Sequence, residues 1–147
     1  MGIQDRLLED MKAAMKSGDK LRLGTIRMLR AQMTDGRIAK GADLTEQDEI
    51  AVLTSAVKKR REAIELFDRG GRTDLVDKEQ KEIEVISQYL PKQLSTSEVE
   101  EVIVGVIAEV GAVGLKDLGK VMAEAMKELK GKADGRMVQE LVRKKLA

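Results

Sequence analysis

Apolar residues recur at intervals of three, four and seven along almost the whole chain, and this spacing constrains the fold more than any other feature. It is the period of an amphipathic α-helix, whereas a half-buried strand would alternate apolar and polar residues. No segment shows sustained alternation. Aromatic residues make up only 1% of the chain, so the core must be built from Leu, Ile, Val, Met and Ala. The sequence therefore predicts an all-α fold.

Glycine, proline and capping residues divide this pattern into about seven helices. The expected helix ends in the first part of the chain are Ser17-Gly18, a point between Gly36 and Gly41, Gly70-Gly71 and Pro91. Further along, Ser95 and Glu98 have the spacing of a capping box, and Asp134 is placed to cap the last helix. We therefore predict two helical subdomains, an N-terminal bundle of about four helices in residues 1–93 and a C-terminal three-helix domain in residues 94–147.

The same spacing predicts which side chains form the core. In the first expected helix, the apolar stripe consists of Ile3, Leu7, Met11 and Met15. In the fourth, the residues expected to be buried are Val76, Ile83, Ile86 and Leu90.

The residue types that are missing exclude several kinds of chemistry. The chain contains no His and no Cys, so histidine bases, cysteine nucleophiles and imidazole or thiolate metal sites cannot form. Acidic pairs such as Glu82 and Glu84 are two residues apart and do not face one another on a helix. The methionines on the apolar stripes are interpreted as core residues. We predict no catalytic residue, no metal site and no cofactor.

The expected location follows from the apolar segments and the start of the chain. No segment approaches the roughly 18 apolar residues that a membrane span requires. The first residues lack the basic and apolar regions of an export signal. We therefore expect a soluble, cytoplasmic protein that does not bind membranes.

Charge is balanced overall but unevenly distributed near the C-terminus. The net charge is +1, from 27 basic and 26 acidic residues. Residues 95–115 contain no basic and four acidic residues, whereas residues 116–147 contain nine basic and five acidic residues. The basic segment has two interpretations. It could face the phosphates of an RNA, or it could be a solvated helix surface, which is the commoner case in soluble proteins.

Two local features could bind an anion. In the loop from Lys130 to Arg136, two glycines and three cations surround a helix start, which suits an anion. However, Asp134 as the helix cap would use the free amides and repel phosphate, so a purely structural turn is the alternative. The second expected helix carries Lys20, Arg27, Arg30 and Arg37 within about a quarter turn, so these side chains could follow a phosphate backbone. The run from Lys58 to Arg61 is less informative, because four consecutive helical residues point in four directions.

Three separated segments resemble the GatB/YqeY family. They are residues 22–31 (RLGTIRMLRA), residues 88–95 (QYLPKQLS) and the stretch from Asp117 to Leu146. The likeness covers essentially the whole chain and is greatest to the free-standing bacterial YqeY-like members. The last stretch is also similar to the tail of GatB, a subunit of the glutamine-dependent amidotransferase that converts misacylated Glu-tRNA or Asp-tRNA. The resemblance implies a tRNA-associated helical module, with a family-level link to carbon-nitrogen ligase activity that uses glutamine as amido donor. It supplies no catalytic residue.

The leading hypothesis is therefore a binding module for tRNA or for a tRNA-processing enzyme, and sequence-specific DNA binding is not expected. The candidate RNA-binding residues are Lys120, Lys130, Lys132, Arg136, Lys144, Arg27 and Arg30. The alternative is a protein-interaction adaptor that does not bind RNA and docks through the acidic helix from Glu98 to Glu109 or through its apolar helix faces. Catalysis by this chain alone is the least expected function. If the chain is linked to amidotransferase chemistry, we expect it to be an accessory to a glutamine-dependent tRNA amidotransferase.

Overall fold

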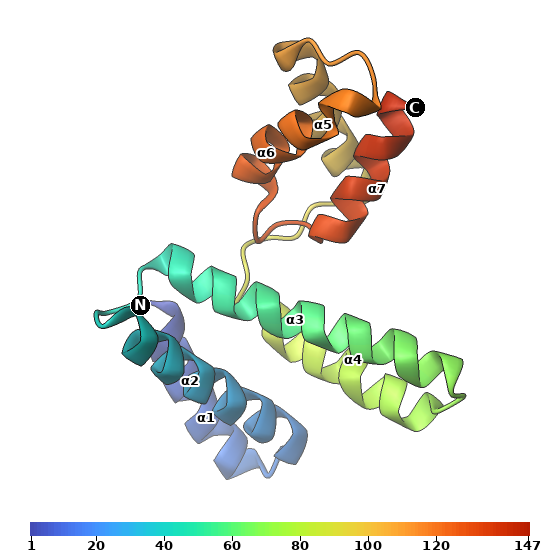
Figure 1. Ribbon diagram of the computed structural model, residues 1–147. Coiled ribbons are helices and arrows are strands. Elements are labelled where there is room, and N and C mark those ends of the chain that lie inside the picture. The colour runs from blue at the N-terminus through green and yellow to red at the C-terminus, as the bar shows by residue number, and fades with distance from the viewer. The chain divides into compact units, whose positions relative to one another are not determined.

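The computed structural model describes residues 1–147 and contains helices but no strands (Figure 1). The predicted all-α fold is confirmed. The chain divides into two compact units, Met1–Leu90 and Pro91–Ala147, which are described separately below. The expected boundary between residues 93 and 94 falls three residues further along the chain than this division. None of the helices is both long enough and apolar enough to cross a membrane.

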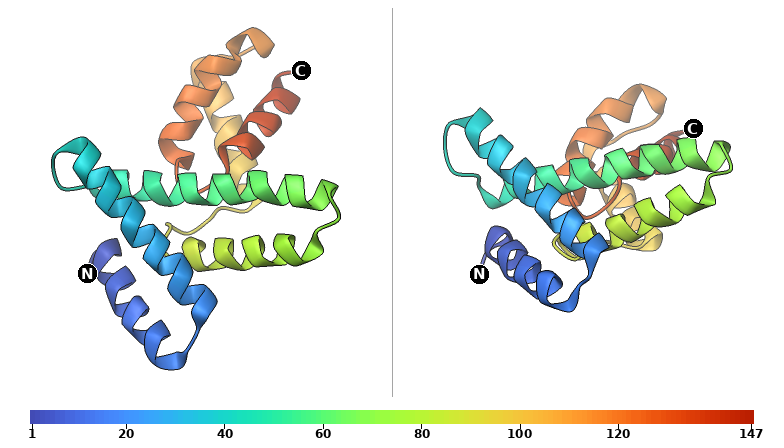
Figure 2. Two further views of the ribbon diagram at one scale, coloured as in Figure 1. Left: turned by 60° about the horizontal axis from the view of Figure 1, so that its bottom comes forward. Right: turned by 90° about the horizontal axis from the view of Figure 1, so that it is seen from below.

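The first unit is built from two helical hairpins. Its helices are α1 (Ile3–Ser17), α2 (Lys20–Lys40), α3 (Glu46–Arg69) and α4 (Thr73–Ser87). Helix α1 packs on α2, α3 packs on α4, and α2 also contacts both α3 and α4. Figures 1 and 2 show that the α3–α4 hairpin extends well beyond its contact with the other hairpin.

Local sequence explains where these helices begin and end. Gly18 and Gly41 adopt left-handed backbone conformations, with φ of 74° and 72°, and so end α1 and α2 as expected. Thr45 and Asp48 form a reciprocal capping box at the start of α3. The Lys40 ammonium donates a hydrogen bond to the Asp48 carboxylate, and the Thr45 amide donates another, which together lower the pKa of Asp48 to about 2. The turn between α2 and α3 is therefore fixed by side chains from both helices.

The core of the first unit is aliphatic except for Tyr89. Its largest fully buried side chains are Leu7, Ile26, Leu29, Met33, Leu53 and Ile86. The stripe expected on α1 is only partly inside, because Met15 is 54% exposed and Ala14 is buried in its place. A spacing of four residues advances by about 40° beyond a full turn at each step, so the fourth member of such a stripe turns away from the core.

The buried residues of α4 and of the turn that follows it also differ from the expected pattern. Val76 and Leu90 are only partly buried, whereas Val85 and Tyr89 lie in the core. Val76 belongs to the start of α4, in the part of the hairpin that extends away from α2 (Figure 2). Val76 and Leu90 are therefore less buried than the sequence pattern predicts.

The second unit is a three-helix domain with one short additional turn. Its elements are α5 (Thr96–Val110), the 3-10 turn η1 (Leu115–Asp117), α6 (Leu118–Leu129) and α7 (Gly135–Leu146). Ser95 and Glu98 form the expected capping box before α5, and the Asp134 side chain accepts a hydrogen bond from the Arg136 amide before α7. Val99, Ile103, Val121, Leu129, Val138 and Val142 are fully buried in its core.

Candidate functional site

The loop from Lys130 to Arg136 joins α6 to α7 and uses its backbone internally. The Lys130 amide donates to the Met126 carbonyl at 3.1 Å, and the Lys132 and Ala133 amides donate to the Leu129 carbonyl at 2.9 and 3.1 Å. Gly131 has a φ of 79°, a conformation that favours glycine. Because these three amides already have partners, this part of the loop is a structural turn, and an anion here would meet its side chains.

The loop is also anchored by the segment that leads into α5. The Leu94 amide donates to the Lys132 carbonyl at 2.9 Å, and Gln93 Nε2 donates to the Gly131 carbonyl at 2.7 Å. These two bonds join parts of the chain that are 38 residues apart. The side chains on the loop therefore project from a fixed backbone.

The three loop cations, which are close in sequence, are all exposed. Lys130, Lys132 and Arg136 all present their side chains to solvent, and Arg136 Nε lies 3.9 Å from Glu140 Oε1 on the next turn of α7. Both members of that ion pair are more than half exposed. Such a pair is weak in water and can exchange for a phosphate at little energetic cost.

Lys120 and Lys144 do not belong to the same cluster. Lys120 lies near the start of α6 and Lys144 near the end of α7, each about a helix length from the loop that joins these helices. Lys120 Nζ lies 3.4 Å from the Val110 carbonyl, so it compensates the exposed carbonyl end of α5. In the adjoining turn, the Val113 amide donates to Asp117 and lowers the pKa of that carboxyl. The candidates in this unit are therefore divided between its two ends.

Arg27 and Arg30 lie on α2, in the other unit, and have different surroundings. Arg27 is exposed and makes no ion pair. Arg30 is half-buried, with its Nη1 donating to the sulfur of Met11 on α1 at 3.2 Å. The four cations expected on one quarter turn of this helix are thus not equivalent, because the Arg30 head group lies against α1.

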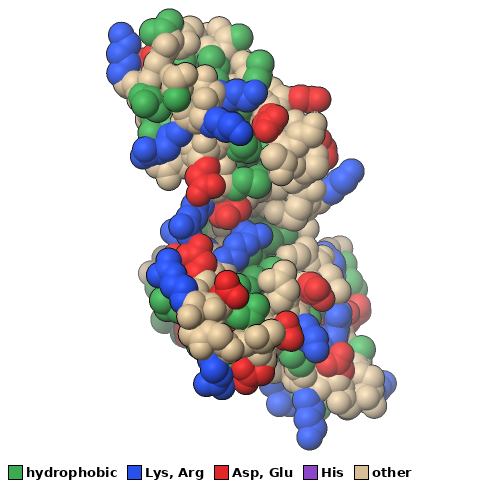
Figure 3. All heavy atoms as spheres, turned by 90° about the vertical axis from the view of Figure 1, so that its right-hand side faces the viewer, with side chains coloured by type: hydrophobic (Ala, Val, Ile, Leu, Met, Phe, Trp, Pro, Cys, Tyr) green, Lys and Arg blue, Asp and Glu red, His purple; other side chains and the backbone are tan.

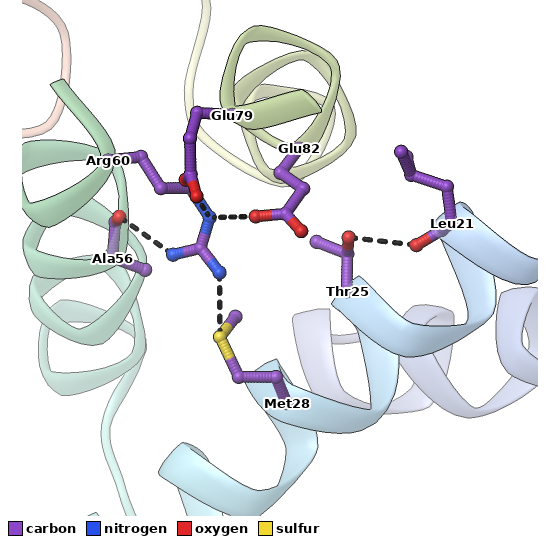
Figure 4. A network of polar contacts seen from close by, with 7 residues as sticks. All are labelled: Leu21, Thr25, Met28, Ala56, Arg60, Glu79 and Glu82. Carbon is purple, nitrogen blue, oxygen red and sulfur yellow. Dashed lines mark hydrogen bonds and ion pairs between the residues drawn. The ribbon is translucent and has the colours of Figure 1, made fainter. Parts of the chain in front are cut away.

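The basic run from Lys58 to Arg61 separates into exposed residues and a buried one. Arg60 is only 13% exposed, and Figure 4 shows its guanidinium surrounded by groups from α2, α3 and α4. Its Nε lies 2.9 Å from Glu82 and 3.9 Å from Glu79, its Nη1 donates to the Ala56 carbonyl, and its Nη2 donates to the Met28 sulfur. Arg60 therefore holds helices together and is not available to a ligand.

A second polar cluster, around Tyr89, could not be found from local patterns. The Tyr89 hydroxyl donates to Asp10, and Arg22 Nη2 lies 3.7 Å from the same carboxylate. Arg6 donates to the Gln88 carbonyl at 2.9 Å, and its guanidinium carbon lies 5.1 Å from the centre of the Tyr89 ring. Burial and the hydrogen bond to Asp10 raise the pKa of Tyr89 well above its ordinary value. The cluster fixes the end of α4 against α1 and α2, and its one sequence signal is a lone Tyr directly before the Leu90-Pro91 junction.

Positive charge does not form one continuous surface on either unit as drawn in Figure 3. There, Lys and Arg side chains alternate with Asp and Glu side chains. On this face, any attraction of a polyanion is consequently local.

Comparison with known proteins gives a consistent family assignment. The YqeY-like protein family matches residues 4–146. The protein called altered inheritance of mitochondria protein 41 from Pyrenophora tritici-repentis is 29% identical over 130 residues, which cover 87% of this chain and 71% of that protein. Its namesake from Lachancea thermotolerans is 38% identical over 95 residues, 64% of this chain, and the match spans only about half of that relative's length, 51%.

A shorter match extends to an archaeal enzyme. One component of the glutamyl-tRNA(Gln) amidotransferase from Methanocaldococcus jannaschii is 46% identical over 59 residues, which make up 37% of this chain and 9% of that component. These relatives are fungal and archaeal, in contrast to the bacterial likeness that the sequence suggested. The similarity is therefore established at the level of the family, and a bacterial source stays a prediction.

Proposed function

This chain belongs to the YqeY-like protein family, and on that premise we propose that it is a tRNA-associated helical module that acts by binding. The observation that supports this most directly is the similarity to a component of an amidotransferase named for glutamyl-tRNA(Gln). The shared segment is only 9% of that component, which is the size of an appended module and far smaller than the whole enzyme. On this proposal, the family link to glutamine-dependent ligase chemistry arises because the chain binds either the tRNA or the enzyme that modifies the tRNA.

The loop cations Lys130, Lys132 and Arg136 are the proposed principal contact. They project from a loop whose backbone is held by bonds to Met126, Leu129 and the Gln93-Leu94 segment, so little ordering of the backbone is needed when they bind. Because the Lys130, Lys132, Ala133 and Arg136 amides already have partners, we expect recognition to come mainly from side-chain charge on phosphates. Contacts of that kind position an RNA without reading its sequence. Lys120 and Lys144, at the far ends of α6 and α7, would add weaker attraction.

Replacement of all three loop cations tests this proposal. Lys130→Ala, Lys132→Ala and Arg136→Ala together are expected to weaken binding of unfractionated tRNA at least tenfold at low salt, about 1.4 kcal/mol. Each lost phosphate contact should also lower the slope of log K against log salt by about 0.7 to 0.9, because fewer counterions are released. Fluorescence anisotropy of labelled tRNA over a salt series measures both quantities.

The matched control removes three exposed cations from the other unit. Lys58, Lys59 and Lys78 lie on the outer surfaces of α3 and α4, and changing all three to Ala alters the net charge by the same amount. This control should change the affinity less than threefold, and circular dichroism should show unchanged helix content in both variants. Equal weakening by the two sets would indicate diffuse attraction, and no weakening by the loop set would remove the loop as a binding site.

A protein-interaction adaptor is the second candidate, and one observation favours it. Three large apolar side chains in and after α5 are exposed, Val104 at 50%, Val113 at 79% and Leu115 at 52%, within a segment that has no basic residue. An adaptor of this kind would retain a partner protein from extract after nuclease treatment, and Val104→Ser, Val113→Ser and Leu115→Ser together would abolish that retention. Retention that disappears with nuclease would favour the RNA proposal instead.

We propose the cytoplasm as the compartment in which the module acts. The fungal relatives are named as mitochondrial proteins, so the mitochondrion is the competing location. Fractionation of the host cell with an antibody to this chain distinguishes the two.

A further inference from the structure

Gly24 lies in the second turn of α2 without any steric reason for being glycine. It is exposed, its backbone is helical, and a Cβ built on it meets no atom within 4 Å. A glycine inside a helix is destabilising relative to alanine, because its unfolded backbone has more freedom to lose. Gly36, further along the same helix, differs, since a Cβ there would contact Leu44 at 3.7 Å. Neither packing nor backbone conformation explains Gly24.

Two cations without partners flank Gly24 on the same side of the helix. Lys20 is four residues before it and Arg27 three residues after it, and both side chains are exposed and make no ion pair or side-chain hydrogen bond. At 100° per residue, Lys20, Gly24, Arg27 and Ala31 fall within about 60° around the helix axis. Ala31 is exposed as well, so the surface between and beyond the two cations carries almost no side-chain bulk. We call these four residues the Gly24 face.

The acidic residues of α2 limit this face but do not neutralise it. Asp19 precedes the helix and is engaged as its cap, accepting a hydrogen bond from the Arg22 amide at 3.1 Å. Asp35 is exposed four residues beyond Ala31, so it bounds the face at its C-terminal end. The first three turns of the helix therefore present positive charge alone on this side.

We propose that the Gly24 face is a second contact for an RNA backbone, which lies against α2 at Gly24 between Lys20 and Arg27. The absence of a side chain at Gly24 lets a sugar-phosphate chain approach the helix backbone closely. Lys20 and Arg27 are about 10.5 Å apart along the helix axis, so an extended chain of phosphates can contact both. This inference rests on the proposed function and names a second surface for it, on the first unit.

A steric variant tests the close approach without changing charge. Gly24→Gln adds bulk where the structure is open, and it should raise the melting temperature because Gln is a better helix former than Gly. Binding of unfractionated tRNA by the full-length variant is nevertheless expected to weaken at least threefold. Gly105→Gln is the matched control, because Gly105 is also helical, exposed and free of neighbours within 4 Å, and lies on the acidic helix α5. It should bind within twofold of the unchanged chain.

A charge variant tests the two cations. Lys20→Ala with Arg27→Ala should lower the affinity at least fivefold at low salt and reduce the salt slope by about 1.4 to 1.8, the value for two phosphate contacts. Lys58→Ala with Lys59→Ala removes the same charge from α3 of the same unit and should leave the slope nearly unchanged. Gly24→Ala adds less bulk than Gly24→Gln but also stabilises the helix. If the affinity of Gly24→Ala falls between those of Gly24→Gln and the unchanged chain, the loss of binding follows bulk and not helix stability.

The outcomes separate the two proposals. If the unchanged chain binds tRNA no better than a protein of equal charge, the proposed function fails and this inference fails with it. If the loop variant weakens binding while Gly24→Gln and the Lys20, Arg27 variant bind normally, this inference alone is overturned. If polyglutamate competes with labelled tRNA for the Gly24 face as effectively as unlabelled RNA does, the face accepts acidic protein segments. The assignment to RNA is then wrong.

Discussion

At the scale of single residues, Tyr89 has the most unusual surroundings. It is the one tyrosine in the chain, it is only 2% exposed, and its hydroxyl faces the carboxylate of Asp10. Burial is the larger cause of its raised pKa, and the hydrogen bond to Asp10 adds to it, while Arg22 and Arg6 oppose the shift. The phenol therefore stays protonated in the folded chain at a pH at which an exposed tyrosine ionises.

This arrangement predicts a loss of stability at alkaline pH. An unfolded tyrosine ionises near pH 10, while folded Tyr89 does not, so the free energy of unfolding should fall as the pH rises above about 10. Tyr89→Phe should remove this contribution. Phenolate absorbance of the folded chain, compared with the chain in urea, measures the titration directly because the chain contains no Trp. A folded-state midpoint near pH 10 would contradict the burial of the hydroxyl.

At the scale of helices, Arg60 connects three elements of the first unit. Its guanidinium contacts Met28 on α2, the Ala56 carbonyl on α3 and Glu82 on α4 (Figure 4). Removal of the guanidinium would leave Glu79 and Glu82 close together with no cation between them. Carboxylates that are 20% and 16% exposed are poorly compensated by water.

Arg60→Ala is therefore expected to destabilise the protein by about 2 to 3 kcal/mol, less than for a fully buried pair because all three side chains retain some exposure. Urea denaturation followed by circular dichroism gives the free energy of unfolding. Lys59→Ala, one residue away and exposed, should change it by less than about 0.5 kcal/mol. A similar loss of unfolding free energy in the two variants would show that the effect comes from the charge of the segment from Lys58 to Arg61 and not from the contacts of the Arg60 guanidinium.

The same helices show what can and cannot be predicted from sequence. The capping box at Ser95 and the stop at Gly18 depend on residues within one turn, so local patterns predict them correctly. The bond between Tyr89 and Asp10 joins residues 79 apart, and helical periodicity carries no information about such pairs. The loop cations can be found because they are close in sequence. Arg60 cannot be distinguished from its basic neighbours in this way, because its partners lie on other helices.

At the scale of the whole chain, the division between the two units is followed by a segment that belongs structurally to the second. Gln93 and Leu94 both bond to the loop before α7, at the Gly131 and Lys132 carbonyls. A domain cut at residue 94, as the capping signal suggested, would lose the Gln93 bond. A cut at residue 91, where the units divide, keeps both.

Two fragments test this difference. Residues 91–147 should fold cooperatively on their own, and residues 94–147 should be less stable by about 1 kcal/mol for the lost hydrogen bond. In a domain this small, that loss lowers the melting temperature by about 4–8 °C, which thermal denaturation followed by circular dichroism can resolve. Equal melting temperatures would show that Gln93 contributes nothing to the second unit, and a fragment 91–147 without a cooperative transition would show that this unit depends on the first.

The pairing of consecutive helices has a kinetic consequence. Helix α1 packs on α2, α3 on α4, α5 on α6 and α6 on α7, so much of each core forms between neighbours joined by short turns. Bringing such neighbours together closes only small loops, and chains dominated by local contacts fold in microseconds to milliseconds. A newly made chain of this kind would hide its aliphatic surfaces soon after each hairpin is complete, leaving little time for them to associate with other chains.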